Sequence, residues 1–414
     1  MHGRFLLAVT ASVAGLALLF GHPLMWRLTW ALGCVLAAAA ILTWSSTRWI
    51  ELGRRTRASR AEVGGLAEES FSIHNRGWLP KLWLEVRDLG DMPGHHAGRV
   101  ISTLWPGSHR SWTVRTVCRR RGMFRLGPVV VAGGDPLGIF RSERRFEQTA
   151  PFVVFPRSYP LRDIDLPTGY LSGGRVIRRR TELATSNVRG VRSYRPGDDF
   201  KRIHWPTSAR RGQLYTREFE LDPVADYWIL LDLDRSVHTG ELGTAIEPGT
   251  MPWLQDSATQ IDPTSEEHAV TAAASLARHF LESGKSVGLI AHGQRRIVAQ
   301  PDRGDRQLAK ILTHLAVLRA AGRAGLSEVL SAESHELKRH ATLVVITPTT
   351  SLRWVEALRG LKQRGVHAMA VLVEANTFGP AGSSEALQAA LAGAYVPTRV
   401  IRNGEPIAAA LEGR

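Results

Sequence analysis

The stretch Tyr227-Trp-Ile-Leu-Leu-Asp232 decides the fold class of the C-terminal half of the chain. It is an unbroken apolar run, which is typical of a strand whose two faces are both covered by helices. Further strands are predicted at 286–291, 341–346 and 366–373, and the segments between them carry apolar residues at helical spacing. This alternation predicts an α/β doubly wound domain over residues 221–414.

The polar stretch Asp232-Leu-Asp-Arg-Ser236 follows the first of these strands directly. Ligands of doubly wound sheets bind beyond the carboxyl ends of the strands, so a site is expected at this loop. The sequence contains no Gly-x-Ser-x-Gly elbow, no His-Glu-x-x-His zinc helix and no complete Walker A loop. These absences favour a protein without catalysis of its own.

Residues 60–150 have the pattern of a small β-sandwich. Short alternating runs such as Glu69-Ser-Phe-Ser-Ile73 are separated by turn sequences rich in Gly, Pro and Asn. The cluster from Arg119 to Pro128, which opens with Arg119-Arg-Arg121, is expected to be a solvated strand end, with contact to phosphate or anionic headgroups as the alternative. His95-His96 is not expected to bind a metal, because no Cys or acidic residue lies at ligand spacing in the sequence.

Two stretches near the N-terminus, 5–26 and 28–47, contain no Asp, Glu, Lys or Arg. Each is long enough for an apolar helix to cross a bilayer core of about 30 Å. Residues 1–50 are therefore predicted to form a transmembrane helical hairpin, with a cleaved signal peptide or a buried helix pair as alternatives. Cations cluster after the second stretch, beginning at Arg48. The positive-inside rule then predicts a multi-pass protein of the inner membrane, with both termini and the soluble domains in the cytoplasm.

The composition of the 414-residue chain limits its class. Hydrophobic residues make up 44% and charged residues 22%, which excludes a disordered chain. The two cysteines, Cys34 and Cys118, exclude a disulfide scaffold and a thiolate zinc cluster. The net charge of +15 and the basic stretch 175–180 suggest an anionic partner, but no nucleic-acid-binding motif accompanies them. Much of this charge lies beside the hydrophobic hairpin, where anionic lipid is the simpler partner.

The densest motif lies in the connecting segment 151–220, between the β-rich region and the α/β domain. Its Arg-Pro-Gly-Asp core predicts a type II turn, because proline fixes φ and glycine accepts a positive φ. Its two aspartates and the neighbouring arginines are expected to form ion pairs that lock the segment. The motif is therefore either a structural brace or a docking surface. Its residues are Tyr194, Arg195, Pro196, Gly197, Asp198, Asp199, Arg202, Trp205, Ala209, Arg210 and Gly212.

This motif resembles the signature of a bacterial family called domain of unknown function 58. Two more elements of that family are present in the expected order, Arg120-Arg-Gly-Met-Phe-Arg-Leu-Gly-Pro128 and Asp135-Pro-Leu-Gly-Ile-Phe140. The resemblance implies a C-terminal domain similar to a von Willebrand factor A domain and, as a partner, a MoxR-type AAA+ ATPase. One departure is His204, which stands where the family usually has Asp.

The resemblance also implies a candidate magnesium site. Von Willebrand A domains often hold Mg²⁺ through an Asp-x-Ser-x-Ser loop, a Thr and a further Asp, which supply the oxygen ligands that this ion prefers. Asp232, Asp234 and Ser236 are the corresponding residues here, while Thr347-Pro348 stands where the further Asp is expected. The site is thus incomplete, and we expect no resident cofactor, with Mg²⁺ as the alternative. Without a metal, the two aspartates cap the following segment or pair with Arg235.

Together, these observations predict a membrane-anchored interaction protein, an adaptor that catalyses no reaction. Its cytoplasmic domain would bind the AAA+ ATPase or that partner's client during protein assembly or activation. One alternative is a metal-dependent hydrolase that uses the Asp232/Asp234 loop. Another is a basic protein that binds nucleic acid or lipid, although no specific nucleic acid is expected as a partner. The segment 239–263 after the candidate site is either a lid or a disordered loop.

Overall fold

The structure, a computed structural model, describes residues 2–162, 164, 188–195, 200, 203–219, 226–240 and 261–413. The chain divides into two compact units. The first comprises Met1–Tyr159, Gly240–Ala274 and Leu312–Arg319, and the second comprises Pro160–Thr239, Ser275–Ile311 and Ala320–Arg414. The first unit therefore contains the N-terminal helices and the β-rich region, and the second contains the sheet that follows.

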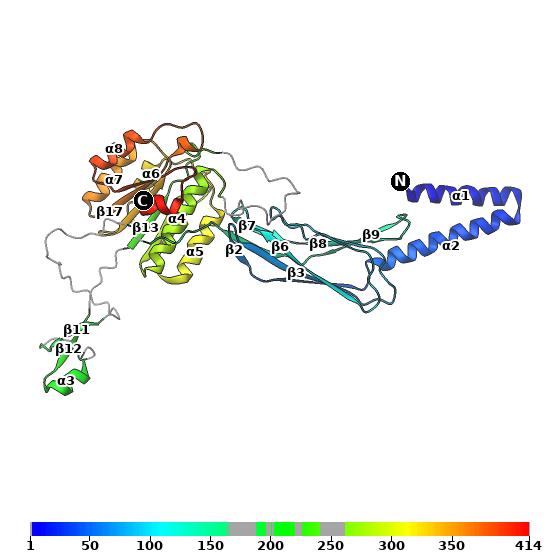
Figure 1. Ribbon diagram of the computed structural model, residues 1–414, viewed down its shortest axis with the longest axis horizontal. Coiled ribbons are helices and arrows are strands. Elements are labelled where there is room, and N and C mark those ends of the chain that lie inside the picture. The colour runs from blue at the N-terminus through cyan, green and yellow to red at the C-terminus, as the bar shows by residue number, and fades with distance from the viewer. Residues whose placement is uncertain are drawn as a thin grey trace. The chain divides into compact units, whose positions relative to one another are not determined.

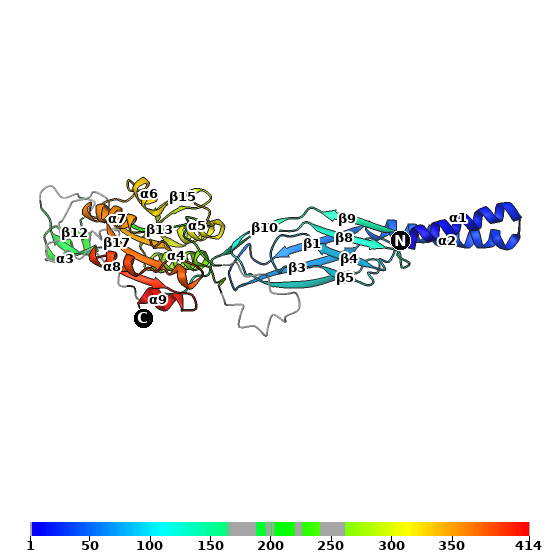
Figure 2. The ribbon, with the colours of Figure 1, turned by 90° about the horizontal axis from the view of Figure 1, so that it is seen from above.

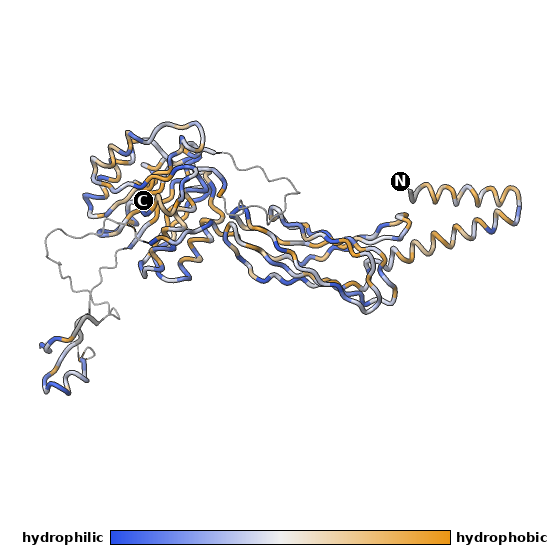
Figure 3. Tube along the Cα trace, in the orientation of Figure 1, coloured by the Kyte–Doolittle hydropathy of each residue, from blue (hydrophilic) through white to orange (hydrophobic). Residues whose placement is uncertain are grey.

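Two apolar helices, α1 (His2–Phe20) and α2 (Pro23–Ser46), open the chain and run antiparallel (Figures 1 and 3). Among the described helices, only α2 is long and apolar enough to cross a membrane, a property that signal sequences share. The apolar part of α1, Phe5–Phe20, is shorter. The prediction of two spans is therefore wrong for α1, because the uncharged run 5–26 also includes the turn at Gly21 and the first residues of α2.

The β-rich region, which is described throughout from 50 to 155, forms three sheets. Their strand orders are β1-β3-β6, β5-β4-β8-β9 and β2-β10-β7. Figure 2 shows β1 beside β3 and β8 beside β9. Phe71 and Trp112 of the first sheet share one buried core with Leu84 and Val131 of the second, so these two sheets pack face to face as a sandwich. The strands are β1 (Ile50–Thr56), β2 (Arg60–Glu62), β3 (Leu66–Asn75), β4 (Leu84–Asp88), β5 (Arg99–Ile101), β6 (His109–Val117), β7 (Gly122–Leu126), β8 (Val129–Gly134), β9 (Arg141–Phe146) and β10 (Ala150–Phe155).

A six-stranded sheet lies in the second unit, in the order β15-β14-β13-β16-β17-β18. Neighbouring strands are parallel except β14 and β15, which pair antiparallel. The carboxyl ends of β13, β14, β16 and β17 therefore meet at one edge of the sheet. The strands are β13 (Asp226–Leu231), β14 (Ser286–His292), β15 (Arg296–Asp302), β16 (Thr342–Thr347), β17 (His367–Val373) and β18 (Thr398–Ile401).

Helices cover both faces of this sheet. Trp228 and Leu230 of β13 belong to a buried core that α6, α7 and α8 complete on one face. On the other face, the ring of Tyr227 lies 4.9 Å from that of Phe280 in α4. Covering on both faces explains the unbroken apolar sequence of β13. The helices are α4 (Ser265–Glu282), α5 (Gly304–Val317), α6 (Leu326–Ala332), α7 (Arg353–Gln363), α8 (Glu385–Gly393), α9 (Ile407–Glu412) and the short 3-10 helix η4 (Ala375–Thr377).

Candidate functional site

Asp232 lies at the carboxyl end of β13, where the sequence predicts a site. Its side chain is buried, at 4% exposure of the residue. One carboxylate oxygen accepts the backbone N–H of Asp234 at 3.1 Å, and the other accepts the hydroxyl of Thr347 at 2.6 Å. Burial raises the pKa of Asp232, and the bonds from Thr347 and Asp234 only partly oppose that shift. Thr347, which replaces an expected aspartate, is thus the direct partner of Asp232.

Asp234 and Ser236 form a compact turn beyond Asp232. The Oδ1 atom of Asp234 accepts both the backbone N–H of Ser236, at 3.0 Å, and its hydroxyl, at 2.9 Å. The backbone of this turn is held by Gly322, whose N–H donates to Leu233 and whose carbonyl accepts from Arg235. A Cβ atom at Gly322 would lie 2.8 Å from the Leu233 carbonyl oxygen, so only glycine fits there. Gly322 is a site residue that the sequence motif did not reveal.

These contacts bear on the candidate magnesium site. Mg²⁺ prefers about six oxygen ligands near octahedral geometry. In the loop, both oxygens of Asp232 and one oxygen of Asp234 already accept hydrogen bonds, and the Ser236 hydroxyl donates to Asp234. The described residues therefore fit the capping alternative better than a metal site.

Two more buried carboxylates lie near the same edge of the sheet. Glu333, 1% exposed, accepts both nitrogens of the Arg296 fork at 2.6 and 2.8 Å and the Nε2 of His292, at the end of β14, at 2.7 Å. Glu374, at the end of β17, accepts from Arg402 at 2.7 Å and from the Ser384 hydroxyl at 3.1 Å. Sequence reasoning missed both groups, because their partners come from separate segments.

The described part of the predicted signature forms a small hairpin. It consists of β11 (Val188–Ser193), α3 (Trp205–Arg211) and β12 (Tyr215–Phe219), and β11 pairs antiparallel with β12. Tyr194 follows β11, and Gly212 ends α3 with a φ of 65°. Arg195, Trp205, Ala209 and Arg210 are exposed. Pro196, Gly197, Asp198, Asp199 and Arg202 lie outside the described residues, and so do the predicted turn, its ion pairs and most of the segment 239–263.

His204 occupies the N-cap position of α3. Its Nδ1 accepts the backbone N–H of Thr207 at 3.3 Å, which satisfies one of the free N–H groups at the start of the helix. Aspartate, asparagine, serine and threonine are the usual residues at this position. The histidine therefore performs the capping role for which the family residue, Asp, is well suited.

Arg121 is buried, which contradicts the prediction of a solvated strand end. Its side chain is 0% exposed and lies within the first unit. The guanidinium donates to the carbonyl oxygens of Leu315 and Leu318 at 3.0 and 2.7 Å, and it pairs with Glu266 and Glu267. Arg119, two residues earlier, is exposed as expected. The basic run thus contains one structural arginine that joins β7 to the start of α4 and the end of α5.

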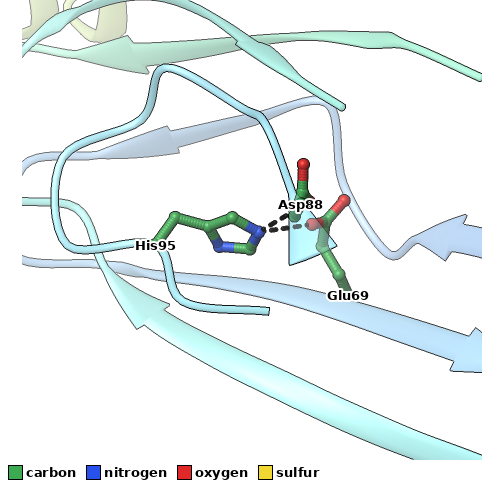
Figure 4. A group of neighbouring side chains, drawn as sticks. All are labelled: Glu69, Asp88 and His95. Atoms are coloured by element: carbon green, nitrogen blue, oxygen red, sulfur yellow. Dashed lines mark hydrogen bonds and ion pairs between the residues drawn. The ribbon is translucent and has the colours of Figure 1, made fainter. Parts of the chain in front are cut away.

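A second buried charge cluster lies inside the sandwich (Figure 4). The Nε2 of His95 lies 3.1 Å from Glu69 and 3.3 Å from Asp88. Arg54 binds Glu69 through two nitrogens, at 2.9 and 2.8 Å, and lies 3.2 Å from Asp88. Each of these four side chains is at most 4% exposed. The fold therefore brings two acids to His95, although no acidic residue lies at ligand spacing from it in the sequence.

The charges of this cluster fit an ion-pair network. Burial alone lowers the pKa of His95, but hydrogen bonds and charge from Asp88 and Glu69 outweigh it and raise the pKa to about 9. Without a metal, the imidazole is therefore protonated at neutral pH and pairs with both carboxylates. Arg54 supplies a second positive charge against the same two carboxylates. The two positive and two negative groups balance one another, as in an ion-pair network.

Residues 190–246 and 255–377 match the family model described as "Protein of unknown function DUF58". This region of the chain, from 190 to 377, thus matches the DUF58 family. The matched residues include both the β11–β12 hairpin and the Asp232–Ser236 loop. The chain is 24% identical over 322 residues to the uncharacterized protein YeaD of Bacillus subtilis, covering 75% of this chain and 72% of YeaD. It is also 25% identical over 245 residues to the uncharacterized protein Rv1480 of Mycobacterium tuberculosis, covering 53% and 69% of the two chains.

Solved structures give only weak similarity to this protein. The CARDB domain of the PF1109 protein from Pyrococcus furiosus has a TM-score of 0.20 and 17% identity, covering 25% of this chain and 86% of that domain. The pilus adhesin SpaC from Lactobacillus rhamnosus GG, in its open conformation, has a TM-score of 0.30 and 10% identity, covering 46% and 28%. Scores this low carry no argument about fold or function.

Proposed function

We propose that this DUF58 protein is a membrane-anchored adaptor without catalysis of its own. It binds a MoxR-type AAA+ ATPase, or that partner's client, during protein assembly or activation. Helix α2 supports the anchor, because it is long and apolar enough to span a bilayer. The family resemblance of the signature supports the partner and a von Willebrand A-like role for the second unit. Arg48, which follows α2, favours the cytoplasmic side of the inner membrane for the soluble units.

The geometry of the carboxyl edge of the sheet carries this proposal. Asp232, Glu333 and Glu374 are buried there, and each accepts hydrogen bonds from neighbouring side chains. A general base needs a free lone pair within reach of a substrate proton. Carboxylates bound in this way instead hold the edge in one shape, and a surface ordered before binding loses little entropy when a partner docks. The edge thus suits recognition of a protein better than chemistry.

Reversing the charge of Arg235 is expected to weaken partner binding. Arg235 is exposed in the turn beyond Asp232, and a charge reversal at a docking surface places like charges against each other. The tagged full-length Arg235→Glu protein, purified from native membranes with and without ATP and Mg²⁺, should recover roughly tenfold less AAA+ ATPase than the wild type. Mass spectrometry identifies and quantifies the recovered ATPase.

Arg339→Glu is the matched control for this experiment. Arg339 is equally basic and exposed, but it precedes the amino end of β16, so recovery of the ATPase should match the wild type. If Arg235→Glu also binds normally, the docking surface is elsewhere, and the exposed signature residues Trp205 and Arg210 are next to be tested. If no AAA+ ATPase is recovered from wild-type protein under any nucleotide condition, the adaptor proposal is wrong.

Magnesium is expected not to bind the Asp232–Ser236 loop. Three of the four carboxylate oxygens of Asp232 and Asp234 already accept hydrogen bonds there. Calorimetric titration of the full-length protein with MgCl₂ should give the same featureless trace for the wild type and for Asp234→Ala. Saturable binding that Asp234→Ala abolishes would establish a metal site, and Mg²⁺-dependent turnover of a phosphoester would then favour the hydrolase alternative.

A further inference from the structure

Exposed tryptophans gather at one end of the sandwich. Trp78 and Trp105 are 71% and 64% exposed, and Trp49, directly before β1, is 41% exposed. Trp112, in the middle of the sandwich, is 8% exposed and belongs to its core. Tryptophan buries more apolar area than any other side chain when it finds a partner, so several exposed copies together indicate a binding surface.

The strand register places these tryptophans together. Ile50 at the start of β1 pairs with Asn75 at the end of β3, and the preceding residue of β3, His74, pairs with His109 at the start of β6. The loops that contain Trp78 and Trp105 are joined by two backbone hydrogen bonds between Lys81 and Leu104, at 3.0 and 2.8 Å. Trp49 joins them, because its carbonyl accepts the backbone N–H of Arg76 at 2.8 Å. We call Trp49, Trp78 and Trp105 the aromatic rim.

Helix α2 enters the sandwich at this same end. The ammonium group of Lys81, 1% exposed, donates to the carbonyl of Ser45, and the hydroxyls of Thr47 and Ser142 lie 2.9 Å apart. Lys81 thereby places a positive charge at the carboxyl end of the helix, where it is favourable. Thr43, Ser45, Ser46 and Thr47 are all buried by these contacts. The last turn of α2 is therefore fixed to the loops that carry the aromatic rim.

The length of α2 sets the depth in the bilayer at which this helix meets the sandwich. A helix rises 1.5 Å per residue, so roughly the first 20 residues of α2 cover the ~30 Å core of a bilayer. That core then ends near Thr43, just before the ring of Trp44, over which the Arg48 guanidinium lies at 4.3 Å. The rings of Trp44 and Trp49 are 5.5 Å apart. The end of the sandwich that contacts the last turn of α2 thus lies at the level of the lipid headgroups.

We propose that the aromatic rim inserts into the headgroup layer around α2 and seats the sandwich on the membrane surface. The inference rests on the membrane anchoring proposed above. Tryptophan prefers this layer, because its ring is apolar and its indole N–H still reaches a hydrogen-bond acceptor. The opposite end of the sandwich exposes Leu66 and Leu89 but, within the described residues, no tryptophan. The rim therefore gives the anchored sandwich one orientation against the bilayer.

A fluorescent probe at single cysteines tests this assignment. The full-length protein is reconstituted in vesicles of phosphatidylethanolamine and phosphatidylglycerol, with an environment-sensitive probe on Trp78→Cys or Trp105→Cys in a Cys34→Ser background. Cys118 stays unlabelled, because it is buried and burial raises the pKa of its thiol to about 11. Leu66→Cys, at the far end of β3, is the matched control. Nitroxide lipids labelled near the headgroup should quench the probes at 78 and 105 several-fold more than the probe at 66.

A probe on native Cys34, which is exposed in the middle of α2, distinguishes the membrane-anchor proposal from the aromatic-rim proposal. If nitroxides deep in the acyl chains quench a probe at Cys34 but shallow nitroxides leave 78 and 105 unquenched, the anchor stands and the rim assignment is wrong. If Cys34 is not quenched either, α2 is not a span and both proposals fail. Probes at 78 and 105 that are shielded from water but unquenched by lipid indicate a protein partner, which also overturns the assignment.

Discussion

Replacing Arg121 with methionine is expected to lower the free energy of unfolding of the first unit by about 3–5 kcal/mol, the usual effect of breaking a buried ion pair from one side. The guanidinium is fully buried and joins four groups, the carbonyls of Leu315 and Leu318 and the carboxylates of Glu266 and Glu267. Methionine fills similar space but donates no hydrogen bond. Two carbonyls and two partly buried acids would then lose the partner that they share.

Urea denaturation followed by labelling of Cys118 measures this effect in the detergent-solubilised, full-length Cys34→Ser protein. Cys118 is 0% exposed and lies three residues before Arg121, so its thiol reacts only when this part of the first unit opens. Arg119→Met is the matched control, because that arginine is exposed and its loss should change the free energy by no more than about 0.5 kcal/mol. Equal urea midpoints for the two variants would show that Arg121 does not hold the unit together.

Elements with a strong local pattern could be predicted from the sequence. β13, β16 and β17 lie within two residues of the apolar runs that predict them, because a strand buried on both faces needs such a run. β15 (Arg296–Asp302) was not predicted. It lies at an edge of the sheet, and its sequence mixes charged and apolar residues with a proline, which edge strands tolerate. The location of the candidate site followed from the topology rule for parallel sheets.

The buried charge networks could not be predicted, because their members are far apart in the sequence. Arg121 donates a hydrogen bond to Glu266, which lies 145 residues later in the chain, and Asp232 accepts one from Thr347, which lies 115 residues later. Ligand and ion-pair patterns are recognised in sequence only when residues recur at short, fixed spacing. His95 is an example. The residues around His95 in the sequence do not predict its contact with Glu69, because Glu69 lies on a separate strand, β3, that is placed beside it only in the folded protein.

The His95 cluster is expected to make the sandwich less stable as the pH rises from about 6.5 to about 9. The pKa of His95 is about 9 in the folded protein and 6.5 in an unperturbed histidine. The folded state therefore holds a proton that the unfolded state releases across this window. The resulting stabilisation is complete below pH 6.5 and is lost as the pH passes about 9, amounting to about 3 kcal/mol at 1.36 kcal/mol per pKa unit.

The acidic members of the cluster give the opposite slope at low pH. Burial raises the pKa values of Glu69 and Asp88, but hydrogen bonds from His95 and the charge of Arg54 outweigh it and lower both. Their contribution is therefore present above the carboxyl pKa values of the unfolded chain and is lost as the pH falls through the lowered values. The sandwich should then be most stable between these two limits, near pH 6, where His95 is charged and both acids are ionised.

His95→Gln isolates the histidine in this experiment. Glutamine still donates a hydrogen bond to Glu69 or Asp88 but carries no titratable proton, so the variant should be less stable than the wild type at pH 6 and nearly equal to it above pH 9. Urea midpoints from Cys118 labelling, compared between the two proteins at each pH, cancel the pH dependence of the thiol itself. A stability difference that stays constant from pH 6 to pH 10 would mean that His95 does not titrate as part of the cluster, because only a proton released on unfolding can make that difference vary with pH.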